Sequence, residues 1–412
     1  MAMPPIRIGL FGLFGVGNFG NEGSLEAMVT FVRNVRPDAQ LTCICGYPRK
    51  AQRDHQISAI PIRLPGPTNV WFRVLDRLFL RTPRVWDLWT RTIKQVRTFD
   101  VLIIPGTGIL GDFGGPPWAS PFAMPLSLLL WCAAAKFCGT RVCFVSVGAG
   151  PIHSRIGRWF VRSAVRLASY RSYRDQASRT FMKSIGLALD DGVFPDLVFG
   201  QPAMPAVNRP HAEPLRVGVG IMEYRGWNSD SEDIYEAYIN KVADFIIFLV
   251  RRGHRVQILI GQASDHWAVG DLLTRIRITE PGLSEGVIAA EQASSLDDVM
   301  RQINKTDLVV ATRFHNVVCA LKLGKPTISI SYAGKNDELL ASMGLGEFCQ
   351  PIELLEVDRL IDQFTRIAAD REKYAHGVRE AVAQCFDRLR QQQSTLCANY
   401  LTKAGRDPTI GR

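Results

Sequence analysis

Residues 6–23 read Ile-Arg-Ile-Gly-Leu-Phe-Gly-Leu-Phe-Gly-Val-Gly-Asn-Phe-Gly-Asn-Glu-Gly, an apolar run that passes directly into a glycine-rich turn. The run predicts a first strand over residues 6–11, and the apolar pattern from about Ser24 predicts a helix behind the turn. A strand, a glycine loop and a helix in this order open a nucleotide-binding type of α/β domain. The stretch therefore indicates an α/β fold.

Further short apolar runs follow, spaced so that helices fit between them. Because they show no polar alternation, they predict strands of a parallel sheet buried on both faces. They cover residues 41–45, 101–104, 142–147 and 168–173. We therefore expect one α/β domain over residues 1–205.

The strand–helix pattern restarts after residues 201–214, which contain four prolines and suit an interdomain linker. The restart predicts strands over 216–221, 255–260, 308–311 and 327–330, with helices over 234–252 and 298–304. A chain of 412 residues also exceeds one ordinary core. We expect a second domain over residues 215–412, with helices after about residue 353 packing across the junction.

The formal net charge of +10 favours an anionic partner, which could be a phosphorylated substrate, an anionic membrane surface or nucleic acid. A basic surface with no single partner is the alternative. No nucleic-acid module or aromatic–basic repeat is present, so we expect no nucleic-acid partner. The first residues run into a strand, and the longest apolar run, 121–135, is too short to span a membrane. A cytoplasmic protein is expected.

Three loops at predicted strand ends hold the polar candidates. They are residues 15–23, residues 105–112, and residues 311–316, the last of which contains Arg313 and His315 directly after an apolar strand. Glycines allow close approach of the backbone to a ligand, and a helix start favours an anion. Each glycine loop could instead be a tight turn that only packs.

In their order along the chain, seven short motifs resemble those of the polysaccharide pyruvyl transferases over roughly residues 6–350. They are Asn18-Phe19-Gly20-Asn21-Glu22, Gly106-Thr107-Gly108, Ser172-Tyr173-Arg174-Asp175, Pro195-Asp196, Arg313-Phe314-His315, Gly324-Lys325-Pro326 and Tyr332-Ala333-Gly334-Lys335. The resemblance implies two Rossmann-like domains of the GT-B type that face a cleft. It also implies phosphoenolpyruvate as donor, a sugar or lipid-linked saccharide as acceptor, a pyruvate ketal as product, and no cofactor.

The resemblance also implies which residues bind substrate. Besides Arg174 and Arg313, they are Asn18, Gly20, Asn21, Gly106, Thr107, Gly108, Asp175 and Lys335. Members of the family usually carry Asp where this chain has Asn21, and a third glycine where it has Thr107. The first departure removes a carboxylate from that position, while Glu22 remains.

Phosphoenolpyruvate carries a carboxylate and a phosphate, which arginine forks bind bidentately. Arg174 and Arg313 are the candidates, one from each predicted domain. Protonation of the donor's methylene carbon needs a general acid, for which we expect His315. The general base is open among Glu22, Asp112 and Asp175, although Asp175 could simply hold Arg174. No cluster of metal ligands is present, so no metal is expected.

Other readings remain at this point. A GT-B glycosyltransferase that uses a nucleotide sugar would share the fold and the glycine loops, and a scaffold without activity is a third candidate. His315 could instead cap the following helix while Arg313 pairs with an acidic side chain. Under that reading neither residue would act on a donor.

Two basic stretches suggest contact with an anionic membrane. Residues 71–97 combine basic residues with Trp71, Phe72, Phe79, Trp86 and Trp89. The second stretch repeats arginine at helical spacing, at Arg155, Arg158, Arg162 and Arg166. The alternative is a pair of solvated basic faces whose aromatic residues belong to the core.

Overall fold

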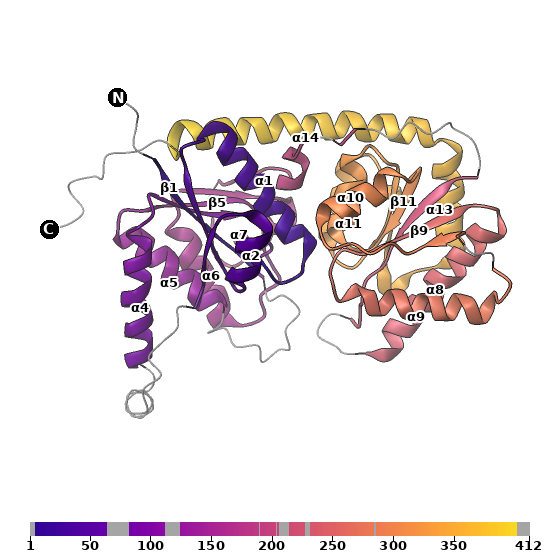
Figure 1. Cartoon of the computed structure of the whole chain (residues 1–412), viewed down its shortest axis with the longest axis horizontal. Coiled ribbons are helices and arrows are strands. Elements are labelled where there is room, and N and C mark those ends of the chain that lie inside the picture. The colour runs from indigo at the N-terminus through magenta and orange to yellow at the C-terminus, as the bar shows by residue number, and fades with distance from the viewer. Residues whose placement is uncertain are drawn as a thin grey trace. The chain divides into compact units, whose positions relative to one another are not determined.

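The computed structural model describes residues 5–63, 82–111, 124–188, 190–202, 204–205, 214–226, 231–283 and 286–401. These residues form two compact units, each with its own parallel sheet (Figure 1). Unit 1 takes the described residues within Met1–Val16, Ser24–Leu197 and Arg390–Arg412, and unit 2 those within Gly17–Gly23 and Val198–Leu389. The predicted fold class, two parallel-sheet α/β domains, is confirmed.

Unit 1 contains a seven-stranded sheet in the order β3-β2-β1-β4-β5-β6-β7. The strands are β1 (Arg7–Phe11), β2 (Gln40–Cys45), β3 (Ser58–Pro61), β4 (Val101–Pro105), β5 (Arg141–Val147), β6 (Tyr170–Tyr173) and β7 (Gly192–Val193). β1 pairs with both β2 and β4, so the strand order reverses at the β1–β4 pair. Ligands of open α/β sheets bind at the carboxyl ends of strands at such a switch point.

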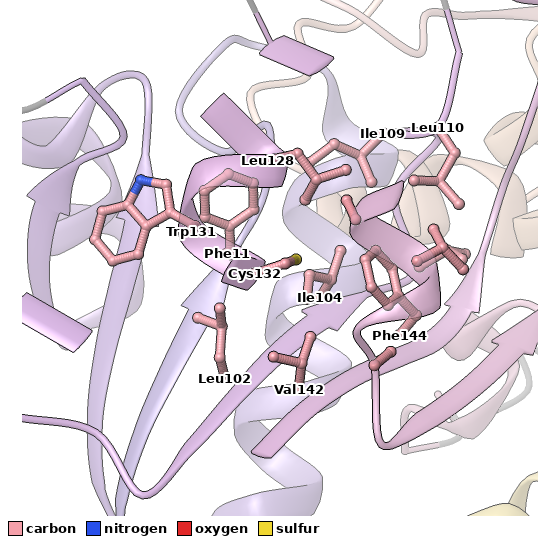
Figure 2. Close-up of a cluster of buried hydrophobic side chains, with 14 of the residues drawn as sticks. Phe11, Leu102, Ile104, Ile109, Leu110, Leu128, Trp131, Cys132, Val142 and Phe144 are labelled. Carbon is pink, nitrogen blue, oxygen red and sulfur yellow. The ribbon is translucent and has the colours of Figure 1, made fainter. Parts of the chain in front are cut away.

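Three helices, α4 (Thr82–Val96), α5 (Met124–Phe137) and α6 (Arg155–Arg166), pack side by side against this sheet (Figure 1). Other helices in this part of the chain are α1 (Phe19–Val35), α2 (Pro48–His55) and α7 (Gln176–Ser184). Figure 2 shows the core beneath α5, where Trp131 lies beside Phe11 with ring centroids 5.9 Å apart. The Trp131 indole is buried and donates a hydrogen bond to the Ile62 carbonyl at 3.0 Å, so its polar atom is satisfied inside the core.

Unit 2 also contains a parallel sheet, of six strands in the order β10-β9-β8-β11-β12-β13. They are β8 (Arg216–Gly220), β9 (Arg255–Leu259), β10 (Ile288–Ala289), β11 (Leu308–Ala311), β12 (Thr327–Ser331) and β13 (Cys349–Pro351). The helices are α8 (Glu232–Arg251), α9 (Asp265–Thr279), α10 (Leu296–Asn304), α11 (Phe314–Lys322), α12 (Gly334–Ser342) and α13 (Val357–Ala369). Here the strand order reverses at the β8–β11 pair, and Arg313 and His315 follow β11.

The last helix, α14 (Arg371–Asn399), contributes to unit 2 through Leu389 and to unit 1 from Arg390. Its buried Gln392 explains the second assignment. The Gln392 amide nitrogen donates to the Ser172 hydroxyl at 2.9 Å, and the side chain also bonds to the Ser146 hydroxyl at 3.2 Å. The observed units therefore differ from the predicted domains, which a single boundary between residues 205 and 215 would separate, because the chain returns to unit 1 at its end.

Candidate functional site

The first motif loop belongs to unit 2, although it follows the first strand of unit 1. The Phe19 amide donates to the Gly261 carbonyl at 3.2 Å, and Asn18 forms a β-bridge with Gln262. The Asn18 carboxamide oxygen accepts from the amides of Gly20 and Asn21, at 3.1 and 3.2 Å. Asn18 thus caps α1, a structural role that the prediction of substrate binding did not include.

The backbone of Gly20 lies directly against the imidazole of His315. A Cβ at Gly20 would overlap the ring atoms Nδ1, Cγ and Cε1, each at a separation well under 3.0 Å. Gly20 has an ordinary helical backbone, so space, and not conformation, requires glycine at this position. The ring of Phe314 contacts His315 edge to face, with centroids 5.2 Å apart. The structure therefore brings two of the predicted site residues, Gly20 and His315, into contact.

Arg313 forms a bidentate ion pair with the fully buried carboxylate of Asp265. Its Nε donates to Oδ2 at 2.9 Å and its Nη2 to Oδ1 at 2.5 Å. Burial alone would lower the pKa of Arg313, but the Asp265 carboxylate outweighs burial and raises the pKa above its usual value. Asp265 was not predicted from the sequence, because it follows β9 whereas Arg313 follows β11, and no local pattern connects the two residues.

Asp265 also organises the loops after β8 and β9. It accepts from the amides of Glu223 at 3.2 Å, Gly261 at 3.2 Å and Gln262 at 3.0 Å. Since Gly261 in turn pairs with Phe19, the ion pair supports the loop that meets the first motif. The described role of Arg313 is therefore structural, and direct contact with a donor stays a prediction.

Helices α11 and α12 both begin near this point, and neither has a side-chain N-cap. The N-cap of α11 is Arg313, so His315 lies inside the first turn and is not the cap. This also means that Arg313 and His315 do not share an extended segment. The Asn336 amide nitrogen donates to the Thr312 carbonyl at 3.1 Å and to the Ser329 hydroxyl at 3.2 Å, which ties the two helix starts together.

Lys335 is the second residue of α12. Its ammonium nitrogen lies 5.3 Å from the ring centroid of Phe314 and 4.7 Å from that of Tyr332. These cation–π contacts hold a positive charge close to the first residue of α11. Because helix N-termini also favour anions, the two helix starts and Lys335 together are suited to bind an anion in unit 2.

Asn316, which follows His315, is fully buried, and its side-chain oxygen and nitrogen have no hydrogen-bond partner among the described residues. It packs against Gly220 and Gly261, where a Cβ would approach its amide atoms at 2.9 and 3.1 Å. A buried unpaired amide is costly and is often found at functional sites. The sequence offered one signal for Asn316, its place directly after the Arg313-Phe314-His315 motif.

A second cluster, in unit 1, centres on Arg174. Its guanidinium lies between two carboxylates, with Nε 3.3 Å from Asp175 and Nη1 3.6 Å from Asp196. A Cβ at Gly148 would lie 2.6 Å from Nη2, so the guanidinium also packs on the backbone there. Asp175 caps α7 as well, accepting from the Ser178 amide at 2.6 Å. The alternative that Asp175 holds Arg174 therefore matches the observed contacts.

The Gly106-Thr107-Gly108 loop follows β4 at the switch point of the same sheet. Gly106 has a left-handed backbone, with φ of 51°, and lies close to Ser24. The Thr107 carbonyl accepts from the Gly148 amide at 3.0 Å, which links this loop to the one that supports Arg174. Within the described part of unit 1, the buried Thr107 hydroxyl has no hydrogen-bond partner.

Some predictions fall outside these clusters. Asp112 lies outside the described residues, as do Trp71, Phe72 and Phe79. Among the residues that the structure describes, no group of His, Cys, Asp or Glu could hold a metal ion. In the same residues, every helix is too short or too polar to cross a membrane.

Two doubly wound sheets with polar loops at their switch points define a GT-B-like α/β protein. A family model described as polysaccharide pyruvyl transferase matches residues 18–334, which is more than half of the chain. The chain belongs to the polysaccharide pyruvyl transferase family. Among curated proteins, none matches it in sequence.

Solved structures agree on the fold. A UDP-GlcNAc 2-epimerase from Neisseria meningitidis is similar with a TM-score of 0.57 and 10% identity, covering 95% of this chain and 100% of its own. A glycosyltransferase from Rickettsia africae has a TM-score of 0.54 and 10% identity, covering 96% of this chain and 99% of its own. The lipopolysaccharide outer core galactosyltransferase WaaB has a TM-score of 0.52 and 13% identity, covering 95% of this chain and 99% of its own. At these identities the likeness concerns the fold alone.

Proposed function

We propose that this protein transfers a pyruvyl group from phosphoenolpyruvate to a sugar of a polysaccharide or glycolipid precursor, with a pyruvate ketal as product. Membership of the family supports a transferase of this kind. The single observation that carries the proposal is the position of His315, which lies against Gly20 in the first turn of α11. Two motifs far apart in the sequence thereby meet around one group that can donate a proton.

The donor would bind through its two anionic groups. The starts of α11 and α12 present backbone amides, and Lys335 adds a full positive charge beside Phe314. A phosphate or carboxylate fits such a combination of amides and an ammonium group. Asp265 already accepts one N–H from Nε and one from Nη2 of Arg313, so a ligand would have to use Nη1 or the second N–H of Nη2.

The reaction needs one proton at carbon and two new bonds at C2. His315 gives a proton to the methylene carbon, which becomes a methyl group, and a sugar hydroxyl bonds to C2. A second hydroxyl then bonds to C2 as the bond to the phosphate oxygen breaks, and phosphate leaves. One hydroxyl proton restores His315 and the other leaves with phosphate. Glu22, in the first turn of α1, is our candidate for the general base.

Two measurements test the proposal. Calorimetric titration should detect binding of phosphoenolpyruvate and none of a panel of nucleotide sugars; the reverse result would favour a GT-B glycosyltransferase. Mass spectrometry of glycolipids and polysaccharides from native cells should then show units heavier by about 70 Da, pyruvic acid less water, that disappear when the gene is deleted. Unchanged spectra together with absent donor binding would refute the proposal.

A further inference from the structure

Helix α6 in unit 1 exposes two large apolar side chains on its outer face. Ile156 is 48% exposed and Trp159 is 52% exposed. They are three residues apart and therefore neighbours on the helix surface. The adjoining face of the helix packs inward, because Phe160, Val161 and Val165 are buried in the unit. The Trp159 ring contacts that of Phe160 edge to face, with centroids 5.4 Å apart, so it is anchored to the unit while about half of it faces solvent.

Positive charge surrounds this apolar pair. Helix α6 contains Arg155, Arg158, Arg162 and Arg166 and no acidic residue. Three of these side chains bond to backbone carbonyls: Arg158 to Ile152 at 2.6 Å, Arg162 to Ile185 at 3.4 Å, and Arg166 to Gly186 at 2.8 Å. A carbonyl partner fixes a guanidinium without neutralising it, so the charge stays available to an anionic surface.

The exposed pair also lies at a defined edge of the unit. Helix α6 begins after the carboxyl end of β5, and Ile156 and Trp159 belong to its first turns. The carboxyl ends of parallel strands share one edge, so the pair lies at the edge where Gly106 and Arg174 follow β4 and β6. Trp86, 69% exposed near the start of α4, belongs to the same layer of helices, in which α5 lies between α4 and α6.

We propose that the outer face of α6 docks on an anionic phospholipid bilayer, with Trp159 and Ile156 in the headgroup region and the arginines on lipid phosphates. A basic amphipathic helix with an exposed Trp has the composition of an interfacial helix. Nucleic acid would use the same charges, but a phosphate backbone gives no apolar environment to Ile156. Exposed apolar residues on α9 fit less well, because Trp267 and Ile278 lie at opposite ends of that helix and Asp271 lies between them.

The test is vesicle flotation of the full chain with phosphatidylcholine alone and with added phosphatidylglycerol. We expect binding only to the anionic vesicles, and its loss at high salt, because screening weakens surface charge attraction. Trp159→Ala should lower the partition coefficient several-fold, and Arg155→Glu about five-fold or more, since each basic residue near the surface contributes about that factor. Trp267 on α9 is the more exposed of the two tryptophans, at 78%, and Trp267→Ala should leave binding unchanged.

Each contrary outcome is decisive. Equal binding to neutral and anionic vesicles, or a loss with Trp267→Ala in place of Trp159→Ala, would overturn the proposal. A third outcome would assign the surface to nucleic acid. In that case the protein binds both anionic vesicles and duplex DNA, and Arg155→Glu weakens this binding whereas Trp159→Ala does not. Circular dichroism checks that the variants fold. Titration with phosphoenolpyruvate should give wild-type affinity in both α6 variants, so failure of docking is distinguishable from failure of the proposed transferase activity.

Discussion

The α-carbon of Gly20 and the imidazole of His315 are in such close contact that no side chain larger than hydrogen fits between them. Gly20 lies in the first turn of α1 and His315 in the first turn of α11, so the contact joins two helix starts within unit 2. The orientation of the imidazole therefore depends on the absence of a side chain at Gly20.

Gly20→Ala should displace the His315 ring while the chain stays folded. Alanine readily adopts the helical backbone conformation of Gly20, so the substitution should lower turnover without preventing folding. We expect turnover to fall by about 100-fold, the usual share of a general acid. The measurement is phosphate release from phosphoenolpyruvate with a native glycolipid extract as acceptor.

Gly270→Ala is the matched control. Gly270 is also helical and lies in α9 of the same unit, and a methyl group added there would meet no atom within 4 Å. Removing a helical glycine there should stabilise the protein by roughly 0.5–1 kcal/mol and leave turnover unchanged. Equal turnover in the two glycine variants would show that the imidazole position does not matter.

His315→Ala tests the acid directly. Donor affinity should stay close to that of the wild type, whereas turnover should fall about 100-fold, because a general acid acts in the transition state. Calorimetric titration gives the first quantity and phosphate release the second. If His315 only supports the first turn of α11, the melting temperature should fall and turnover per folded molecule should not; that result would end its assignment as the acid.

Most of the sheet architecture could be predicted from the sequence, because buried parallel strands read as short apolar runs. The runs at 142–147 and 308–311 coincide closely with β5 and β11. The unit boundaries could not be predicted in this way. Gln392 joins unit 1 through hydrogen bonds to Ser146 and Ser172, and such distant pairings leave no periodic signal.

The site was predictable in its residue types and less so in its contacts. The apolar context correctly placed His315 just after a strand, but it did not show that a helix begins at Phe314. An uncapped helix start after a strand has no Ser, Asp or Asn signal to mark it. The partner of Arg313, Asp265, follows another strand, so only the folded sheet brings the two charges together.

Breaking the Arg313–Asp265 pair should destabilise unit 2 strongly. Asp265→Asn leaves the buried guanidinium without its counter-charge and weakens three backbone hydrogen bonds, so we expect a loss of about 3–5 kcal/mol. Arg313→Lys should cost less, because an ammonium group keeps the charge but not the fork. Denaturant unfolding measures both. An Asp265→Asn variant as stable as the wild type would mean that the pair does not form in solution.

Acid stability should depend on Asp298, which accepts hydrogen bonds from Ser294 and Ser295 at the start of α10. Burial would raise its pKa, but these bonds lower it to about 2, from 3.8. The folded-state pKa is depressed, so the stabilisation is complete above pH 3.8 and disappears as the pH falls through about 2. The Asp298→Asn variant should therefore have a lower melting temperature than the wild type at pH 7 and a similar melting temperature near pH 2. A difference in melting temperature that stays constant across this pH range would contradict the assignment.

Arg174→Lys tests the predicted role of unit 1 in donor binding. A lysine cannot reach both Asp175 and Asp196 with a planar fork, nor offer a bidentate contact to a carboxylate or phosphate. We expect donor affinity to fall about ten-fold or more, the effect of losing one charge-assisted hydrogen bond. Arg171→Lys is the control on β6, the strand that directly precedes Arg174, because Arg171 also pairs with a carboxylate, that of Asp191, at 2.9 Å. Both variants should lower the melting temperature, but only Arg174→Lys should weaken the titration with phosphoenolpyruvate. If the two variants bind the donor equally well, Arg174 serves only to hold its loop, and donor recognition has to be sought in unit 2 alone.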